Sequence, residues 1–303
     1  TAPNGVILVA KSSVGIVNLH GDLQATLPGA TSVSAVGMGV MWATLGPEGE
    51  GTADFGQGLY LIQKNEVALV ANLFHYEDAN DPAGDDDRNS NPYAVQALSA
   101  NSALVIDSGA NDLLRIDKKG NVELLAVFPE ELVSLENFHD LSDCGDNTDG
   151  LCGVPFMPAQ AVPTSIAIGP DGYYYVGELK GFPAPTGASN IWRISPDAMA
   201  AQCGESPDCV ALFEGGFTSI IDMTFSDDGL LYVAEMDVRS WLAVEEGLGE
   251  GGRIQVCDPE TLECHVRAEG IPMLTSIVFD KEGRLWATRN ALTPGAEVVQ
   301  IPL

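Results

Sequence analysis

The chain has 303 residues, and only 14 lysines and arginines oppose 43 aspartates and glutamates, which gives a formal net charge of −29. A surface this acidic repels phosphate backbones and anionic membranes, so we expect no nucleic-acid partner. No apolar run is long enough for a membrane span, and 33 glycines with 45% hydrophobic residues indicate a large core with many turns.

The chain opens inside a repeated unit. Residues 2–6 align with the turn at residues 169–173, and strands are expected at 6–11, 15–19 and 23–27. This unit lacks its innermost strand, and neither an initiator Met nor a signal peptide precedes it. We therefore expect the natural polypeptide to begin further upstream, with strands that complete the first and last units.

The repeat is clearest at residues 163–178, PTSIAIGPDGYYYVGE, which predicts strand, tight turn, strand. Pro170 presets φ and Gly172 supplies a positive φ, so the turn has a physical cause. Ser165 and Glu178 are expected to face each other across this hairpin. Hairpins of the same spacing recur at residues 32–45, 94–107, 222–235 and 276–289.

Two further strands follow each hairpin except the last, which is followed by one. Four short strands repeated six times predict an all-β chain, a six-bladed β-propeller in a single domain over residues 1–303. Helix is expected only in short insertions such as residues 129–135. The blades are expected at about 1–29, 30–73, 91–128, 162–215, 217–269 and 272–303, with the first and last incomplete.

The six cysteines form three pairs that are close in sequence. Locality favours disulfides Cys144–Cys152, Cys203–Cys209 and Cys257–Cys264, whereas the scattered histidines disfavour zinc. Disulfides indicate an oxidising compartment, so we expect a secreted, periplasmic or extracellular protein.

The long connections of a propeller built this way fall on one face. They are residues 46–58, 74–91, 129–162, 179–190 and 236–252. Because long loops on a rigid frame commonly carry function, this long-loop face is the expected binding face.

The last residue of the second strand in each blade is expected to line the upper end of the central channel. In chain order these residues are Lys11, Leu45, Asp107, Glu178, Glu235 and Arg289. Asp222 adds a fourth acid, expected directly across its hairpin from Glu235, where like charges would destabilise the sheet. A cation, a shared proton or Arg289 must offset that repulsion.

Two interpretations of these acids stay open. They form a structural salt-bridge ring between blades, or Asp107, Glu178, Asp222 and Glu235 hold calcium, which prefers oxygen ligands. A second calcium candidate is the acidic loop with Asp143, Asp146 and Asp149, although Gly145 occupies the position of the first EF-hand ligand. Residues 85–87 are interpreted as a solvated acidic loop, and no motif predicts an organic cofactor.

Several segments resemble one family. They are residues 91–95 (NPYAV), 107–115 (DSGANDLLR), 162–165 (VPTS), 176–183 (VGELKGFP), 217–222 (FTSIID) and 76–82 (YEDANDP). Together they resemble the secreted, NHL-like six-bladed propeller proteins of the ScyD/ScyE type, from about residue 60 to the end. The acidic 144–152 insertion and the truncated first blade depart from that family. The resemblance implies an exported propeller, but it carries no catalytic residues over to this chain.

Two functions follow from these observations. The first is an exported scaffold that binds a small molecule, a peptide or a partner protein on its long-loop face, with calcium as a candidate ion. The second is a metal-dependent, lactonase-like hydrolase with its site at the top of the channel, by analogy at fold level. No G-x-S-x-G motif occurs, and no histidine is expected beside the acids to serve a nucleophile.

Overall fold

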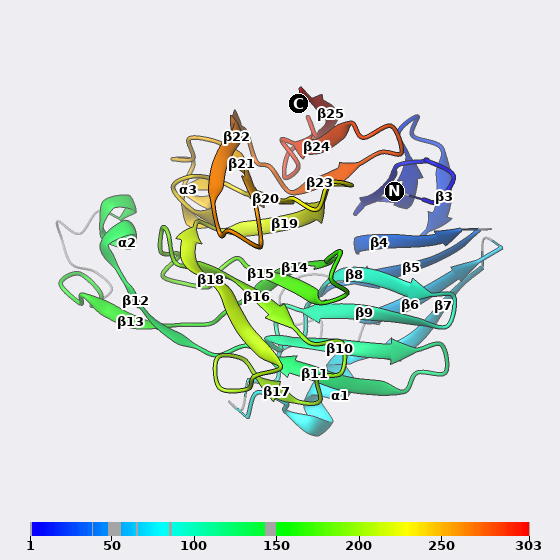
Figure 1. The fold of residues 1–303 in the computed structure, drawn as a ribbon, viewed down its shortest axis with the longest axis horizontal. Coiled ribbons are helices and arrows are strands. Elements are labelled where there is room, and N and C mark those ends of the chain that lie inside the picture. The colour runs from blue at the N-terminus through cyan, green and yellow to red at the C-terminus, as the bar shows by residue number, and fades with distance from the viewer. Residues whose placement is uncertain are drawn as a thin grey trace. The chain divides into compact units, whose positions relative to one another are not determined.

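The computed structural model describes residues 2–37, 39–47, 56–64, 66–84, 87–142 and 150–302. The chain is all-β, with six antiparallel blade sheets of mostly four strands, the arrangement of a β-propeller, which confirms the predicted fold class (Figure 1). It divides into two compact units. Unit 1 comprises Thr1–Phe128, Asp197–Asp208 and Asp280–Glu282, and unit 2 comprises Pro129–Pro196, Cys209–Phe279 and Gly283–Leu303.

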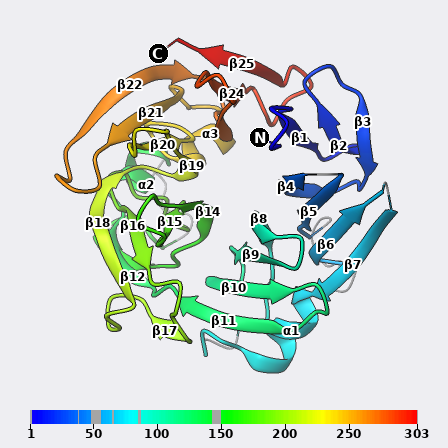
Figure 2. The same cartoon turned by 45° about the vertical axis from the view of Figure 1, so that its right-hand side comes forward.

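Unit 1 contains the first three blades, and helix α1 (Leu73–Asn80) follows blade 2. Blade 1 has three strands, as predicted, and blade 3 gains a fifth strand from β17, which pairs parallel to β11 (Figure 2). The strands are β1 (Leu8–Lys11), β2 (Gly15–Asn18) and β3 (Leu23–Thr26) in blade 1; β4 (Ala30–Gly37), β5 (Val40–Leu45), β6 (Gly58–Gln63) and β7 (Glu66–Asn72) in blade 2; and β8 (Pro92–Ser99), β9 (Ser102–Asp107), β10 (Asp112–Asp117), β11 (Val122–Val127) and β17 (Ala201–Gln202) in blade 3.

Unit 2 contains the other three blades, helices α2 (Glu136–Leu141) and α3 (Trp241–Glu245), and a separate hairpin of β12 (Glu131–Ser134) and β13 (Phe156–Ala159). Blade 6 has three strands, as predicted. The strands are β14 (Pro163–Ile168), β15 (Tyr174–Glu178), β16 (Ser189–Ile194) and β18 (Cys209–Phe217) in blade 4; β19 (Ile220–Phe225), β20 (Leu231–Glu235), β21 (Gly252–Cys257) and β22 (Cys264–Ile271) in blade 5; and β23 (Ser276–Phe279), β24 (Leu285–Arg289) and β25 (Glu297–Ile301) in blade 6.

The core of each unit lies between neighbouring blade sheets. In unit 1, Trp42 of blade 2 is fully buried against Val105 and Leu114 of blade 3, and its indole Nε1 donates to the Ser99 carbonyl at 2.8 Å. In unit 2, Ile191 and Phe213 of blade 4 pack with Val233 of blade 5. Alternating apolar residues point into these layers because side chains alternate faces along a strand.

The repeat's turn forms as predicted. Gly172 has a φ of 80°, and its amide donates to the Gly169 carbonyl at 2.9 Å. The register of this hairpin differs from the expectation, because a β-bulge after Pro163 places Ser165 opposite Gly177 and Pro163 opposite Glu178. A bulge adds one residue to one strand and thereby changes which side chains face each other.

The expectation of helix at residues 129–135 is wrong. The segment forms strand β12, which pairs antiparallel with β13 through Leu132 opposite Pro158, and helix α2 begins only at Glu136. Pairing with β13 satisfies the backbone hydrogen bonds of this segment, and Val133 is buried on one face, so the strand is favoured over a helix.

The cysteines are oxidised where the structure describes them. Cys257–Cys264 is confirmed as a disulfide, and Cys152, Cys203 and Cys209 are all disulfide-bonded. Cys144 lies outside the described residues, so the pairings Cys144–Cys152 and Cys203–Cys209 stay predictions.

Candidate functional site

Three acids at strand ends are buried, each at the end of the second strand of its blade. Asp107 ends β9, Glu178 ends β15 and Glu235 ends β20, and all three are almost completely shielded from solvent. Lys11 and Arg289, the two bases expected to accompany them, are exposed at the ends of β1 and β24. Arg289 pairs instead with Glu297 on its own hairpin, with Nη2 2.6 Å from Oε2.

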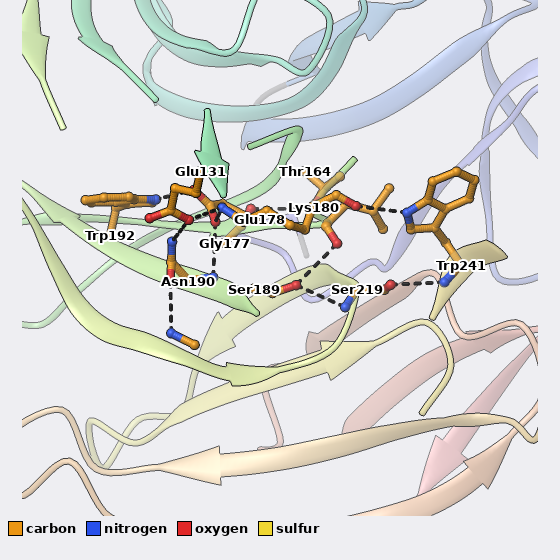
Figure 3. Close-up of polar contacts among 12 residues, drawn as sticks. Glu131, Thr164, Gly177, Glu178, Lys180, Ser189, Asn190, Trp192, Ser219 and Trp241 are labelled. Carbon is orange, nitrogen blue, oxygen red and sulfur yellow. Dashed lines mark hydrogen bonds and ion pairs between the residues drawn. The ribbon is translucent and has the colours of Figure 1, made fainter. Parts of the chain in front are cut away.

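Glu178 of unit 2 is neutralised by a lysine two residues further on. Lys180 is fully buried, and its ammonium lies 2.8 Å from Glu178 Oε2 and also contacts Glu131 Oε2 on β12 (Figure 3). The backbone of Lys180 has a φ of 67°, which turns its side chain back toward the strand that it has just left. Lys180, which lies in the segment 176–183 that carries the family resemblance, therefore supplies the positive charge beside Glu178.

Two further donors complete the shell around Glu178. The Trp192 indole Nε1 donates to Oε1 at 2.5 Å, and the backbone amide of Asn190 donates to Oε2 at 3.1 Å. Burial raises the pKa of Glu178, while Lys180 and Trp192 lower it and the nearby Glu131 charge raises it. Asn190 Nδ2 also donates to Glu131 Oε2 at 2.8 Å, which ties blade 4 to the β12–β13 hairpin.

A strip of hydroxyl and indole groups joins blades 4 and 5 beside this network. Ser189 Oγ donates to the Leu179 carbonyl at 3.2 Å and accepts from the Ser219 amide at 3.0 Å. Ser219 Oγ in turn accepts from the Trp241 amide at 3.0 Å, and the Trp241 indole donates to the Lys180 carbonyl at 2.9 Å (Figure 3). The loops that follow β15 and β20 are thus fixed to each other by hydrogen bonds.

Glu235 of blade 5 has its own base. Arg253, opposite it on β21, binds both carboxylate oxygens, through Nε to Oε2 and through Nη2 to Oε1 at 3.0 Å. Gln255 Nε2 donates to Oε2 at 3.0 Å and the Thr218 amide to Oε1 at 2.6 Å. Such a bidentate pair is among the stronger charge-assisted interactions.

The expected contact between Asp222 and Glu235 does not form. A bulge between Ile220 and Asp222 places Ile220 opposite Glu235 and Asp222 opposite Ala234, so the two acids point to opposite faces of the sheet. Asp222 turns to blade 6, where Ser276 Oγ donates to it at 2.7 Å and the Ile277 amide at 2.8 Å. Burial raises the pKa of Asp222 to about 6 despite these donors.

Asp107 of unit 1 is held by neutral donors alone. Ser90 Oγ donates to Oδ2 at 2.6 Å, and the amides of Asn91, Gly109 and Ala110 donate to Oδ1 at 2.5, 3.1 and 3.2 Å. Burial raises the pKa of Asp107 and these donors lower it.

Among the residues that the structure describes, no three His, Cys, Asp or Glu side chains lie close enough together to hold a metal ion. Calcium at the predicted acids stays a prediction. Asp143, Asp146 and Asp149 lie outside the described residues, as do Asp85 and Asp86. For Glu178, Asp222 and Glu235 the donors are protein groups, so these acids act as hydrogen-bond acceptors.

The β12–β13 hairpin has one apolar face that no part of the described chain covers. Leu132 is 71% exposed and Phe156 is 56% exposed, and Pro158 is exposed beside them. They share one face, because Leu132 lies opposite Pro158 and Phe156 lies opposite Ser134. Val133 and Ala159 on the other face are buried. Figure 1 shows the hairpin and α2 set apart from the blade-4 sheet.

The hairpin and its neighbouring loops are fixed at their base. Asn137 of α2 donates through Nδ2 to the Ala184 carbonyl at 2.7 Å, the Arg239 carbonyl at 3.1 Å and Ser240 Oγ at 3.0 Å. Phe138 stacks edge-on against Phe182, with ring centroids 5.2 Å apart. Three of the long connections predicted from the sequence therefore form one ordered surface in unit 2.

Several solved structures are similar to this chain over most of its length. The nidogen/laminin complex matches with a TM-score of 0.57 at 10% identity over 98% of this chain and 89% of that one. A gluconolactonase from Xanthomonas campestris gives 0.55 at 10% identity, over 98% and 82%. A streptogramin B lyase gives 0.51 at 15% identity, over 94% and 77%.

These similarities show the fold alone, because the identities are so low. No protein-family model matches the chain, and no curated protein matches it. In the part of the chain that the structure describes, no helix is long and apolar enough to cross a membrane.

Proposed function

We propose that the chain is an exported binding module that takes a partner protein on the exposed apolar face of hairpin β12–β13. The observation that carries this proposal is the exposure of Leu132 and Phe156 on a hairpin whose other face is anchored. Exposed aromatic and aliphatic side chains on a rigid frame are typical of interface centres. Anchoring through Glu131 lowers the entropy that a partner must overcome on binding.

The partner is a protein with an apolar centre and basic surroundings. Exposed Glu130, Glu136 and Asp140 lie beside the apolar face along the chain, and the whole chain carries a net charge of −29. Opposite charges around an apolar centre raise association rates and exclude acidic competitors. Export is supported by the Cys257–Cys264 disulfide and by the resemblance to secreted ScyD/ScyE-type propellers.

The alternative is a metal-dependent, lactonase-like hydrolase, to which the fold similarity to a gluconolactonase lends support. Against it stand the hydrogen bonds of the four candidate acids, whose oxygens already accept from Lys180, Arg253, Ser90 and Ser276. Each of these donors would have to be displaced before a metal could bind there. A binding module needs no such change.

The proposal is tested with a photo-crosslinking amino acid at position 156, in culture supernatant of the source organism. The same group at Val210, exposed on the outer strand of blade 4, is the matched control. A partner captured at 156 and not at 210 is then purified, and its affinity is measured by calorimetry.

We expect Leu132→Ser and Phe156→Ser each to raise the Kd at least tenfold, and Val210→Ser to leave the Kd unchanged. Affinity should fall as salt rises, because the rim is acidic. Unchanged affinity in both hairpin variants would overturn the proposal. Turnover of a lactone that depends on a divalent metal, and is lost in Glu178→Gln, would establish the hydrolase instead.

A further inference from the structure

Blade 3 places two acids opposite each other where blades 5 and 6 each place an acid opposite an arginine. Glu235 faces Arg253 in blade 5, and Arg289 faces Glu297 in blade 6. In blade 3 the corresponding pair is Asp107 and Asp112, which are direct partners across β9 and β10. Like charges opposite each other destabilise a sheet, so this pair needs a positive charge from elsewhere or a bound proton.

Asp112 is the member of the pair that lacks a donor. Its side chain is 0% exposed, and among the described residues neither carboxylate oxygen has a hydrogen-bond partner. Asp107 beside it accepts four hydrogen bonds, so its charge is already accommodated. An uncompensated buried carboxylate is costly, so Asp112 calls for a compensating group.

Two more buried oxygen-bearing side chains belong to the same region of unit 1. Glu77 of α1 is 1% exposed, and its charge acts on Asp112. Gln57 is 5% exposed, and its Oε1 has no hydrogen-bond partner among the described residues. None of the three side chains offers a positive charge, and together they present carboxylate and amide oxygens.

Local contacts place the three segments near one another: Leu73 of α1 belongs to the same buried cluster as Leu114 of blade 3, and it also contacts the backbone of Gln57. The Gln57 carbonyl accepts from the amide of Leu73, the first residue of α1, at 2.9 Å. Leu73 and Glu77 lie one helical turn apart and are the buried residues of α1, so both face inward. The pKa of Tyr76, on the same helix, is raised by burial and by the charges of Asp112 and Glu77, which agrees with this placement.

We propose that Asp112, Glu77 and the amide oxygen of Gln57 form an internal cation site of unit 1, suited to calcium. Carboxylate and amide oxygens without histidine or thiolate ligands select hard cations. The cation would do in blade 3 what Lys180 does for Glu178 and Arg253 does for Glu235. Because all three side chains are buried, we assign the cation a structural role.

The two carboxylates, Glu77 and Asp112, lie in segments 76–82 and 107–115, which also carry the family resemblance, whereas Gln57 lies outside them. The site belongs to unit 1 and the β12–β13 hairpin to unit 2, and the cation proposal does not depend on the proposed binding function. A proton is the competing occupant: burial, followed by the charges of Asp107 and Glu77, raises the pKa of Asp112 well above its ordinary value.

The test uses the full chain, stripped with chelator and then titrated with calcium chloride while thermal unfolding is followed. The parent should gain about 5 °C or more in Tm at about a hundredfold excess over Kd. Terbium in place of calcium should give emission sensitised by Tyr76. Asp112→Asn and Glu77→Gln should each lose both responses, and Asp222→Asn, which alters a partly buried acid in unit 2, should keep them.

Calcium elsewhere on this acidic chain is distinguished by the variants. If Asp112→Asn keeps the full Tm response and the terbium emission, the cation lies at another place and the proposal is wrong. If the chelated parent is folded and ignores calcium, Asp112 holds a proton and the proposal is equally wrong. Should Asp112→Asn fail to fold, Glu77→Gln and Tyr76→Phe decide: the latter should bind calcium with unchanged affinity and lose terbium emission.

Discussion

The Lys180 ammonium lies 2.8 Å from the Glu178 carboxylate, and both side chains are completely shielded from solvent. Breaking one half of such a pair leaves an uncompensated buried charge. We expect Lys180→Met to lower the free energy of unfolding by about 3–5 kcal/mol, measured by denaturant titration. The double variant Glu178→Gln/Lys180→Met should recover part of that loss; if it is less stable than Lys180→Met, the pair does not act as described.

Glu131 connects the same lysine to the β12–β13 hairpin. Glu131→Gln should leave the blade sheets intact and loosen the hairpin, since the charged contact to Lys180 and the acceptor for Asn190 Nδ2 are weakened. Hydrogen exchange of amides in residues 131–134 should accelerate at least tenfold. Glu130→Gln, at the exposed neighbour, is the control and should change nothing.

Asp222 should make stability depend on pH. Burial raises its pKa from 3.8 to about 6, so the folded chain binds this proton more tightly than the unfolded chain does. The resulting stability is complete below about pH 4 and is lost as the pH rises to about 6, with a slope of up to about 1.4 kcal/mol per pH unit. Other buried acids act in the same direction, so the measurement is the difference between the parent and Asp222→Asn. A difference that is flat between pH 4 and 6 would contradict the assignment.

Asp222 and Glu235 should act independently, because they point to opposite faces of β19–β20 and have separate partners. The double-mutant cycle of Asp222→Asn and Glu235→Gln should give a coupling energy below about 0.5 kcal/mol. Glu235→Gln alone should destabilise, since it breaks the bidentate pair with Arg253. A coupling energy well above that value would contradict this prediction and would indicate that the two acids interact directly.

The disulfides should be local. Peptide mapping without reduction should find 257–264, 203–209 and 144–152, and Cys257→Ser/Cys264→Ser should cost about 2–3 kcal/mol of stability. Any cross-pairing among the other four cysteines would contradict the two pairings that are still predictions.

The blades were predictable because their signals are local. Turn residues such as Pro170 and Gly172, with alternating apolar residues on both sides, specify a hairpin without any distant contact. The buried acids at the strand ends followed from the same repeat spacing, which placed Asp107, Glu178 and Glu235 at equivalent positions.

Their partners were not predictable, because bulges and single backbone angles decide them. One inserted residue turned Asp222 away from Glu235, and a positive φ at Lys180 returned its side chain to Glu178. The signal for Asp112 was present in the sequence: two acids flank a four-residue connection between paired strands. The sequence alone does not show that Asp112 is buried and that its carboxylate has no hydrogen-bond donor among the described residues.

Because strand β17 is synthesised long after strand β11, one edge of blade 3 stays unpaired during part of translation. Ala201 and Gln202 pair with Ala126 and Val127, so the outer edge of blade 3 is covered by chain that leaves the ribosome some seventy residues later. Until then the β11 edge is open to pairing with a neighbouring chain. Slowed translation between residues 128 and 201 should therefore increase aggregation, whereas the same pause after residue 202 should not.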